Sequence, residues 1–166
     1  MNAEGRVTAP FGRRSVPVVS REQHGPYVVL ACSDLAGPRP RAGQFYMLAA
    51  AGRWGGGESE RPFLPRAFSV LRAPAASSEL HFLMEDVGPG TRRLCELRPG
   101  EELALVGPLG NGFWRTGPDQ EALLVGGGVG IAPLAILQDE LDNARALLGF
   151  RDAGRARGAA LMRHPR

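Results

Sequence analysis

The sequence contains no lysine, and all 20 of its basic side chains are arginine. We attribute this bias to a GC-rich coding sequence rather than to a ligand. The formal net charge is only +3, and the arginines are scattered along most of the chain. A nucleic-acid partner is therefore not predicted, because such proteins concentrate their basic residues on one face.

Cysteines and long apolar runs are also scarce. Cys32 and Cys95 are too few for a structural zinc site or a four-cysteine cluster, so we expect two buried or partly buried thiols. His24, His81 and His164 lack metal-ligand spacing, and no metal site is predicted. No run reaches the length of a membrane span, and the first residues lack the apolar core of a signal peptide. These absences predict a cytoplasmic protein without a membrane partner.

Glycine and proline are abundant, with 23 and 14 residues, which favours short strands over long helices. Turn residues bracket six apolar segments, and strands at this spacing predict an antiparallel barrel within residues 16–115, after a flexible N-terminus at 1–15. One short helix is expected at Gly90–Leu97, and an exposed, mobile loop at Ala51–Arg61. The six predicted strands are Val16–Ser20, Tyr27–Ser33, Gln44–Ala49, Ala67–Arg72, Glu79–Glu85 and Glu102–Val106.

The pattern changes after Pro118. A strand at Glu121–Val125, a glycine turn, a helix at Ile131–Leu141 and a strand at Ala146–Phe150 predict one βαβ unit with parallel strands. One such unit leaves a sheet face uncovered, so residues 119–166 are interpreted as an incomplete α/β nucleotide-binding domain.

Several residues have the chemistry of a cofactor site. Arg66 can neutralise a diphosphate, Phe68 offers an aromatic surface, and Ser69 can hydrogen-bond a polar ring edge. Alternation puts Arg66 and Phe68 on one face of a strand, and Ala67 and Ser69 on the other. An ordinary strand with an exposed arginine is the alternative.

Two glycine-rich segments add to this pattern. Gly90 and Thr91 open the predicted short helix, where backbone N–H groups favour a phosphate, although Thr91 as a simple N-cap is the alternative. The preceding Glu85 and Asp86 are interpreted as solvated, with a position facing the flavin pocket as the alternative. The segment Gly107–Phe113 is expected to be a loop that serves either as a ligand contact or as a hinge.

Gly126, Gly127, Gly128 and Gly130 lie between an apolar strand and a helix, which is the context of a nucleotide-binding loop. They do not match the Gly-x-Gly-x-x-Gly fingerprint in any register. The acidic residue expected at the end of the next strand is also not clear.

The order of these motifs resembles the ferredoxin-reductase superfamily, and within it the electron-transfer subunits of type B dihydroorotate dehydrogenases. The segments that carry the resemblance, which runs from about Val16 to about Phe150, are Gly43–Phe45, Arg66–Ser69, Gly90–Thr91, Gly107–Phe113 and Gly126–Pro133. It implies an FAD-binding barrel followed by a nicotinamide-nucleotide domain.

By this resemblance, Arg66, Gly90 and Thr91 would bind the FAD diphosphate, while the Ala67–Ser69 segment would lie along the isoalloxazine. Gly126, Gly127, Gly128 and Gly130 would line the NAD(H) pocket. No side chain is predicted to be catalytic, because FAD does the chemistry. The implied partner is the catalytic dihydroorotate dehydrogenase subunit in a hetero-oligomer.

The sequence departs from the family in two ways. The family has proline at the position of Ala67 and often an aliphatic residue at that of Phe68. Its members also continue into a cysteine-rich segment that binds a [2Fe–2S] cluster, whereas this sequence ends at Arg166. Three alternatives stay open: a related reductase subunit serving another acceptor, a truncated, non-catalytic FAD-binding module, and a barrel interaction domain without cofactor.

Overall fold

A computed structural model describes residues 12–53, 64–114, 117 and 119–163. Residues 1–11 of the predicted flexible N-terminus and residues 54–61 of the predicted mobile loop lie outside the described residues.

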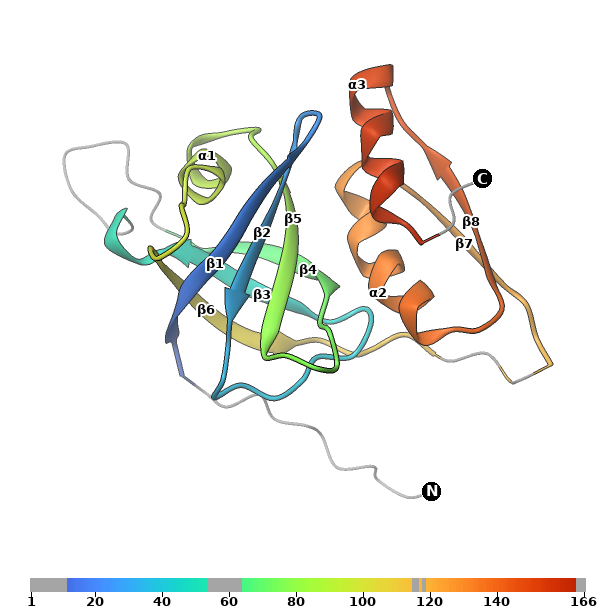
Figure 1. Cartoon of the computed structure of the whole chain (residues 1–166), viewed down its shortest axis with the longest axis horizontal. Helices are drawn as coiled ribbons and strands as arrows, with labels where there is room; N and C mark the ends of the chain where they lie inside the picture. The colour runs from blue at the N-terminus through green and yellow to red at the C-terminus, as the bar shows by residue number, and fades with distance from the viewer. Residues whose placement is uncertain (1–11, 54–63, 115–116, 118, 164–166) are drawn as a thin grey trace.

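The first part of the chain is a closed, six-stranded antiparallel barrel, which confirms the prediction (Figure 1). Its strands follow one another around the barrel in the order β1-β2-β5-β4-β3-β6. All six neighbouring pairs are antiparallel, so the barrel has no free strand edge. The strands are β1 (Arg14–His24), β2 (Tyr27–Ser33), β3 (Phe45–Ala50), β4 (Arg66–Arg72), β5 (Glu79–Glu85) and β6 (Glu102–Leu109), with a 3-10 helix, η1, at Ala51–Arg53.

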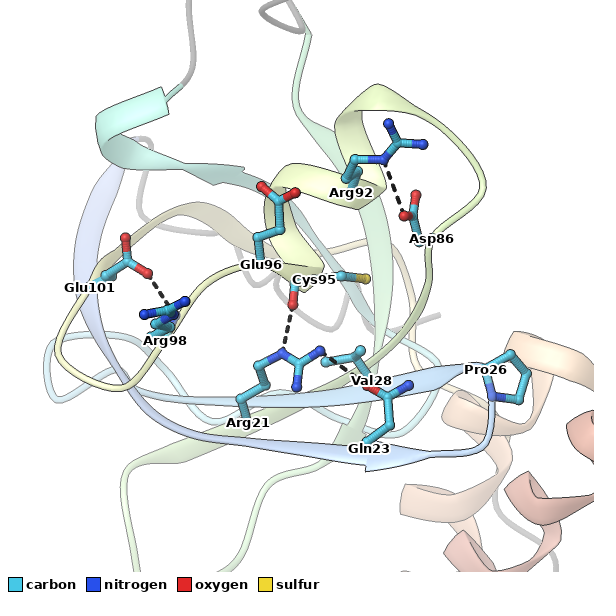
Figure 2. A pocket seen from close by; sticks show the side chains of 10 residues that line it. All are labelled: Arg21, Gln23, Pro26, Val28, Asp86, Arg92, Cys95, Glu96, Arg98 and Glu101. Carbon is cyan, nitrogen blue, oxygen red and sulfur yellow. Dashed lines mark hydrogen bonds and ion pairs between the residues drawn. The ribbon is translucent and has the colours of Figure 1, made fainter.

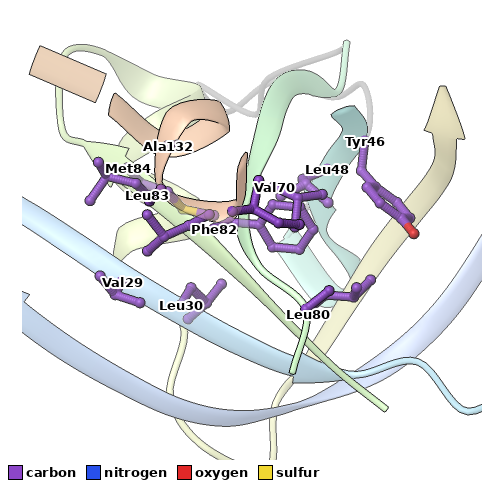
Figure 3. Packing of buried hydrophobic residues seen from close by; sticks show 14 of the residues in the cluster. Val29, Leu30, Tyr46, Leu48, Val70, Leu80, Phe82, Leu83, Met84 and Ala132 are labelled. Carbon is purple, nitrogen blue, oxygen red and sulfur yellow. The ribbon is translucent and has the colours of Figure 1, made fainter. Parts of the chain in front are cut away.

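The core of the barrel is built from large apolar side chains of the inner strand faces (Figure 3). The rings of Tyr46 and Phe82 meet edge to face at a centroid distance of 5.5 Å. Helix α1 (Pro89–Cys95) contacts β3 and β5, and Leu94 is completely buried there. The helix therefore contributes to the core as well as positioning Gly90.

Two expectations about strands were wrong. Tyr27–Cys32, expected to be half-buried, is buried throughout, partly because Gly158 from the far end of the chain packs on Tyr27. Gly107, Pro108 and Leu109, expected in a loop, belong to β6. A Cβ atom at position 107 would lie 2.4 Å from Cδ1 of Tyr46, so this glycine lets the strand pass close to the buried ring.

The second part of the chain is the predicted βαβ unit followed by a short helical segment. Strands β7 (Ala122–Gly127) and β8 (Ala144–Gly149) pair in parallel. Helix α2 lies between this sheet and the barrel and contacts β4 (Figure 1). The helical elements are η2 (Gly128–Ile131), α2 (Ala132–Glu140), α3 (Ala153–Ala156) and η3 (Arg157–Leu161). None of the helices in the described residues is long and apolar enough to cross a membrane.

The two faces of this small sheet differ sharply. Leu124 and Ala146 are buried on the side of α2. Leu123, Val125 and Leu147 on the opposite side are exposed by 66%, 63% and 59%. The sheet thus has the uncovered face expected of a single βαβ unit.

Candidate functional site

Arg66 and Gly90 are brought together by the packing of α1 against the barrel. A Cβ atom on Gly90 would lie 2.8 Å from Nε of Arg66 and 3.0 Å from its Cζ. Arg66 Nη1 also donates a 2.6 Å hydrogen bond to the carbonyl oxygen of Leu64. The guanidinium group is therefore held against the first turn of α1, where the absence of a side chain on Gly90 makes room for it.

Thr91 lies beside this pair but is not the helix N-cap. The N-cap is Gly88, and no side chain caps the helix. Thr91 Oγ1 accepts a hydrogen bond from Val87 N at 2.9 Å and donates one to Gly88 O at 3.0 Å. Its hydroxyl therefore fixes the turn before α1, which corrects the alternative interpretation of Thr91 as N-cap.

The remaining residues of the predicted flavin segment occupy both faces of β4. Phe68 pairs with Tyr46 of the neighbouring strand β3 and packs partly against the core, while Ser69 pairs with Phe45. Ala67 is exposed. Because cross-strand partners project to the same face, Phe68 lies on the side of buried Tyr46 and Ser69 on the other. The alternation expected from the sequence is therefore observed.

The four predicted nucleotide-site glycines have different surroundings. A Cβ on Gly126 would lie 2.6 Å from Leu134 Cδ1, and one on Gly127 would lie 2.0 Å from Gly149 O. These two glycines allow α2 and β8 to pack closely. Gly128 has a left-handed φ of +56°, and a Cβ there would lie 3.9 Å from Tyr27 Oη. A Cβ on Gly130 would have no neighbour within 4 Å among the described residues, so Gly130 borders open space.

The contact between barrel and second unit was missed by sequence reasoning. Glu85, expected to be solvated, is half-buried and forms an ion pair with Arg155. Arg155 also pairs with Asp152, which caps α3 by accepting a hydrogen bond from Arg155 N at 2.9 Å. The hydrogen bonds from Arg155 lower the pKa of the Asp152 carboxyl group. The ion pair connects residues 70 positions apart.

Further contacts hold the two parts together. Arg72 of β4 pairs with Asp139 of α2 and donates to the carbonyl of Leu161 in η3. Gly25, with φ +62°, lies so close to α3 that a Cβ would be 2.4 Å from Gly154 O. The segment from α3 to η3 is thus packed against the barrel at several points. Each contact joins distant parts of the chain, so no local sequence signal marks it.

Both cysteines are free and buried, as predicted. Burial raises the pKa of the Cys32 thiol to about 12 and that of Cys95 to about 11. Buried, protonated thiols are poor nucleophiles and poor metal ligands. They therefore have no place in the candidate site.

A cavity of about 1010 Å³ is lined by none of the predicted site residues (Figure 2). It lies between the β1–β2 hairpin and α1. Arg21 donates to Cys95 O at 2.7 Å, and Arg92 pairs with Asp86 at 3.2 Å. The guanidinium groups of Arg21 and Arg92 are thus already engaged by protein oxygens. Three arginines and three acidic residues line the cavity, so their formal charges balance.

No family model matches the chain, but known proteins are similar to it in sequence. It is 34% identical over 130 residues to the dihydroorotate dehydrogenase B (NAD(+)) electron transfer subunit of Bacillus pumilus (strain SAFR-032), covering 75% of this chain and 48% of the relative. The corresponding subunit of Bacillus velezensis (strain DSM 23117 / BGSC 10A6 / LMG 26770 / FZB42) is 34% identical over 133 residues, with coverages of 76% and 50%. This chain is a relative of these electron-transfer subunits. It spans about half the length of these two relatives.

Two solved structures have a fold similar to that of this chain. A ferredoxin reductase in carbazole 1,9a-dioxygenase superposes with a TM-score of 0.71 at 23% identity, covering 87% of this chain and 44% of that one. A ferredoxin NADP+ reductase from Neisseria gonorrhoeae with bound FAD and NADP gives a TM-score of 0.64 at 19% identity, with coverages of 86% and 59%. The chain therefore has the ferredoxin-reductase-type fold.

The residues of this chain fit an FAD diphosphate at one point in particular. The guanidinium of Arg66 lies over Gly90, in a space that a Cβ atom would fill. A cation beside the N–H groups of a helical turn is a suitable environment for a diphosphate. The open space beside Gly130 lies in the glycine turn between β7 and α2.

Proposed function

We propose that this chain binds FAD on its barrel and transfers electrons between NAD(H) and a partner protein. The observation that carries the proposal is the placement of Arg66 against Gly90 at the start of α1. Bound FAD would supply the chemistry, by taking an electron pair from NADH and passing electrons onward.

The residues have separate roles in this proposal. Arg66 neutralises the diphosphate, while Gly90 and Thr91 shape the turn on which it rests. The Ala67–Ser69 segment borders the flavin ring, and Ser69 is positioned to hydrogen-bond its polar edge. Gly126 and Gly127 hold the sheet and α2 close together, so that Gly128 and Gly130 can border the nicotinamide nucleotide.

We further propose that the partner is a catalytic dihydroorotate dehydrogenase subunit, in a hetero-oligomer that oxidises dihydroorotate in pyrimidine biosynthesis. The names of the relatives in Bacillus pumilus and Bacillus velezensis support this assignment. A [2Fe–2S] cluster would be the electron relay in such an assembly. A related reductase that serves a different acceptor would use the same barrel residues.

A second candidate is a flavin-binding module that needs another polypeptide for reduction by nucleotide. The exposed apolar face formed by Leu123, Val125 and Leu147 favours this candidate. Apolar patches of this kind are usually covered in a functional protein. Both candidates share the FAD site and differ in whether the isolated chain responds to NADH.

FAD binding is tested by titrating the purified chain with FAD and following the quenching of flavin fluorescence. Arg66→Ala should raise the FAD Kd by tenfold or more, because a charge-assisted contact to a phosphate is worth about 1.5–3 kcal/mol. Arg13→Ala removes an exposed arginine outside the site and should leave the Kd unchanged. A folded chain that does not bind FAD would overturn the proposal, as would equal Kd values for the two variants.

A further inference from the structure

The side chain of Tyr27 is completely buried, yet its hydroxyl has no hydrogen-bond partner among the described residues. Buried hydroxyls are nearly always paired, because an unpaired one loses its bonds to water without replacement. An orphaned hydroxyl at the junction of two structural units therefore requires an explanation.

The ring of Tyr27 is fixed from both parts of the molecule. Tyr27 pairs with Glu85 in the β2–β5 ladder. On the other side, a Cβ on Gly158 would lie 2.9 Å from Tyr27 Cε2. The phenol is thus clamped between the barrel and η3, and its hydroxyl cannot swing away to find a partner.

The hydroxyl faces the turn at Gly128. A Cβ atom built on Gly128 would have Tyr27 Oη, at 3.9 Å, as its only neighbour within 4 Å among the described residues. Gly128 has a φ of +56°, so the backbone there favours glycine as well. The turn at Gly128 therefore lies within van der Waals contact of the buried phenol oxygen.

We propose that Tyr27 Oη donates a hydrogen bond to an amide carbonyl oxygen of the dinucleotide bound at the Gly128 turn. Two groups have this chemistry: the carboxamide of nicotinamide and the carbonyls of the flavin ring. The inference rests on the proposed function and adds a positioning residue that the sequence motifs do not include.

Local charge favours a neutral acceptor over a phosphate. Glu85 lies beside Tyr27 and is already paired with Arg155. Burial raises the pKa of the Tyr27 phenol most, and the nearby charge of Glu85 raises it further. The phenol therefore keeps its proton and acts as a hydrogen-bond donor at neutral pH. A phosphate at this position would meet the charge of the Glu85 carboxylate, whereas an amide oxygen would not.

Tyr27→Phe is the direct test, and Tyr46→Phe is its matched control. Tyr46 is also completely buried with an unpartnered hydroxyl, but its ring packs on Gly107 inside the barrel. Each substitution removes an unpaired buried hydroxyl and keeps the ring. Both variants should therefore unfold at the same temperature as the parent chain or higher when no ligand is bound.

Affinities are measured in two arms by calorimetry: FAD on the ligand-free chain, and NAD+ on the FAD-loaded chain. Tyr27→Phe should weaken one of the two by about fivefold, while Tyr46→Phe weakens neither. Loss in the NAD+ arm identifies the carboxamide, and loss in the FAD arm identifies the flavin ring.

Unchanged affinities of Tyr27→Phe in both arms would overturn the inference and leave the proposed function intact, with a trapped water as the partner of the phenol. Equal losses in Tyr27→Phe and Tyr46→Phe would also overturn it, because the effect would then not be specific to the Gly128 turn. A parent chain that binds neither ligand would instead overturn the proposed function, and the inference with it.

Discussion

Nε of Arg66 lies 2.8 Å from the position that a Cβ atom would take on Gly90. This relationship joins a strand residue and a helix residue that are far apart in sequence. It also makes the two positions dependent on each other, because any side chain at position 90 must displace the guanidinium group.

Gly90→Ala should therefore reduce FAD affinity without unfolding the chain. The displaced atoms belong to the end of a flexible side chain, and alanine favours helix more than glycine does. We expect the FAD Kd to rise about tenfold with little change in the free energy of unfolding. Gly52→Ala is the control, since a Cβ there would have no neighbour within 4 Å in the part of the chain that the structure describes. Equal FAD affinity of the two variants would argue against a diphosphate at Arg66.

The ion pair between Glu85 and Arg155 should stabilise the junction more than an exposed pair stabilises the surface. Side-chain exposures are 16% for Glu85 and 24% for Arg155, against 42% for Glu121 and 61% for Arg145. Glu85→Gln should cost about 1–2 kcal/mol in urea unfolding, and Glu121→Gln under about 0.5 kcal/mol. Similar losses in the two variants would show that the junction gains nothing from this pair.

Stability should fall at alkaline pH because of buried thiols and phenols. Unfolded thiols ionise near 9.0, whereas the pKa is about 12 for Cys32 and about 11 for Cys95 in the folded chain. Burial raises the pKa of Tyr27 and Tyr46 as well. Above pH ~9 the unfolded state binds fewer protons than the folded state, so the free energy of unfolding decreases as pH rises.

The absence of lysine makes this alkaline effect easy to assign, because no ammonium side chain titrates in the same range. Urea unfolding between pH ~7.5 and pH ~10.5 measures it. Replacing Cys32 and Cys95 by alanine should flatten the profile relative to the parent chain. A parent profile that stays level or rises would show that these groups are not buried as described.

Gly107 should be intolerant of substitution for a reason of packing. Its added Cβ would lie 2.4 Å from the ring of Tyr46, which is fully buried and has no room to move. Gly107→Ala is expected to cost about 1–3 kcal/mol by overpacking. Gly12→Ala, where a Cβ meets no atom of the described residues within 4 Å, should be neutral. Urea midpoints of the two variants compare the effects directly.

Strands flanked by turn residues were predictable from the sequence. Tyr27–Ser33 and Glu79–Glu85 have the predicted bounds. The first strand was predicted only at Val16–Ser20, whereas β1 runs from Arg14 to His24, because its polar end is defined by pairing with β2 rather than by apolar alternation. The strand order and the closure of the barrel depend on long-range pairing that no local pattern shows.

The candidate site could be proposed from its residue types, but its geometry could not. Motif order pointed to Arg66 and Gly90, yet their contact depends on how α1 packs on the barrel. The unpartnered hydroxyl of Tyr27 had no sequence signal, since a tyrosine at the start of an apolar strand resembles any other core residue. Its orphaned hydroxyl is visible only once β2, η2 and η3 are assembled.

The central claim is tested most directly by anaerobic titration of the FAD-loaded chain with NADH, following the flavin absorbance band. The account predicts that the band bleaches with about one equivalent of NADH. Bleaching should decrease in a chain with Arg66→Ala, in proportion to the FAD that this variant fails to retain. A flavin that stays oxidised in a folded, FAD-loaded chain would contradict electron transfer from NAD(H) and leave only a flavin-binding module.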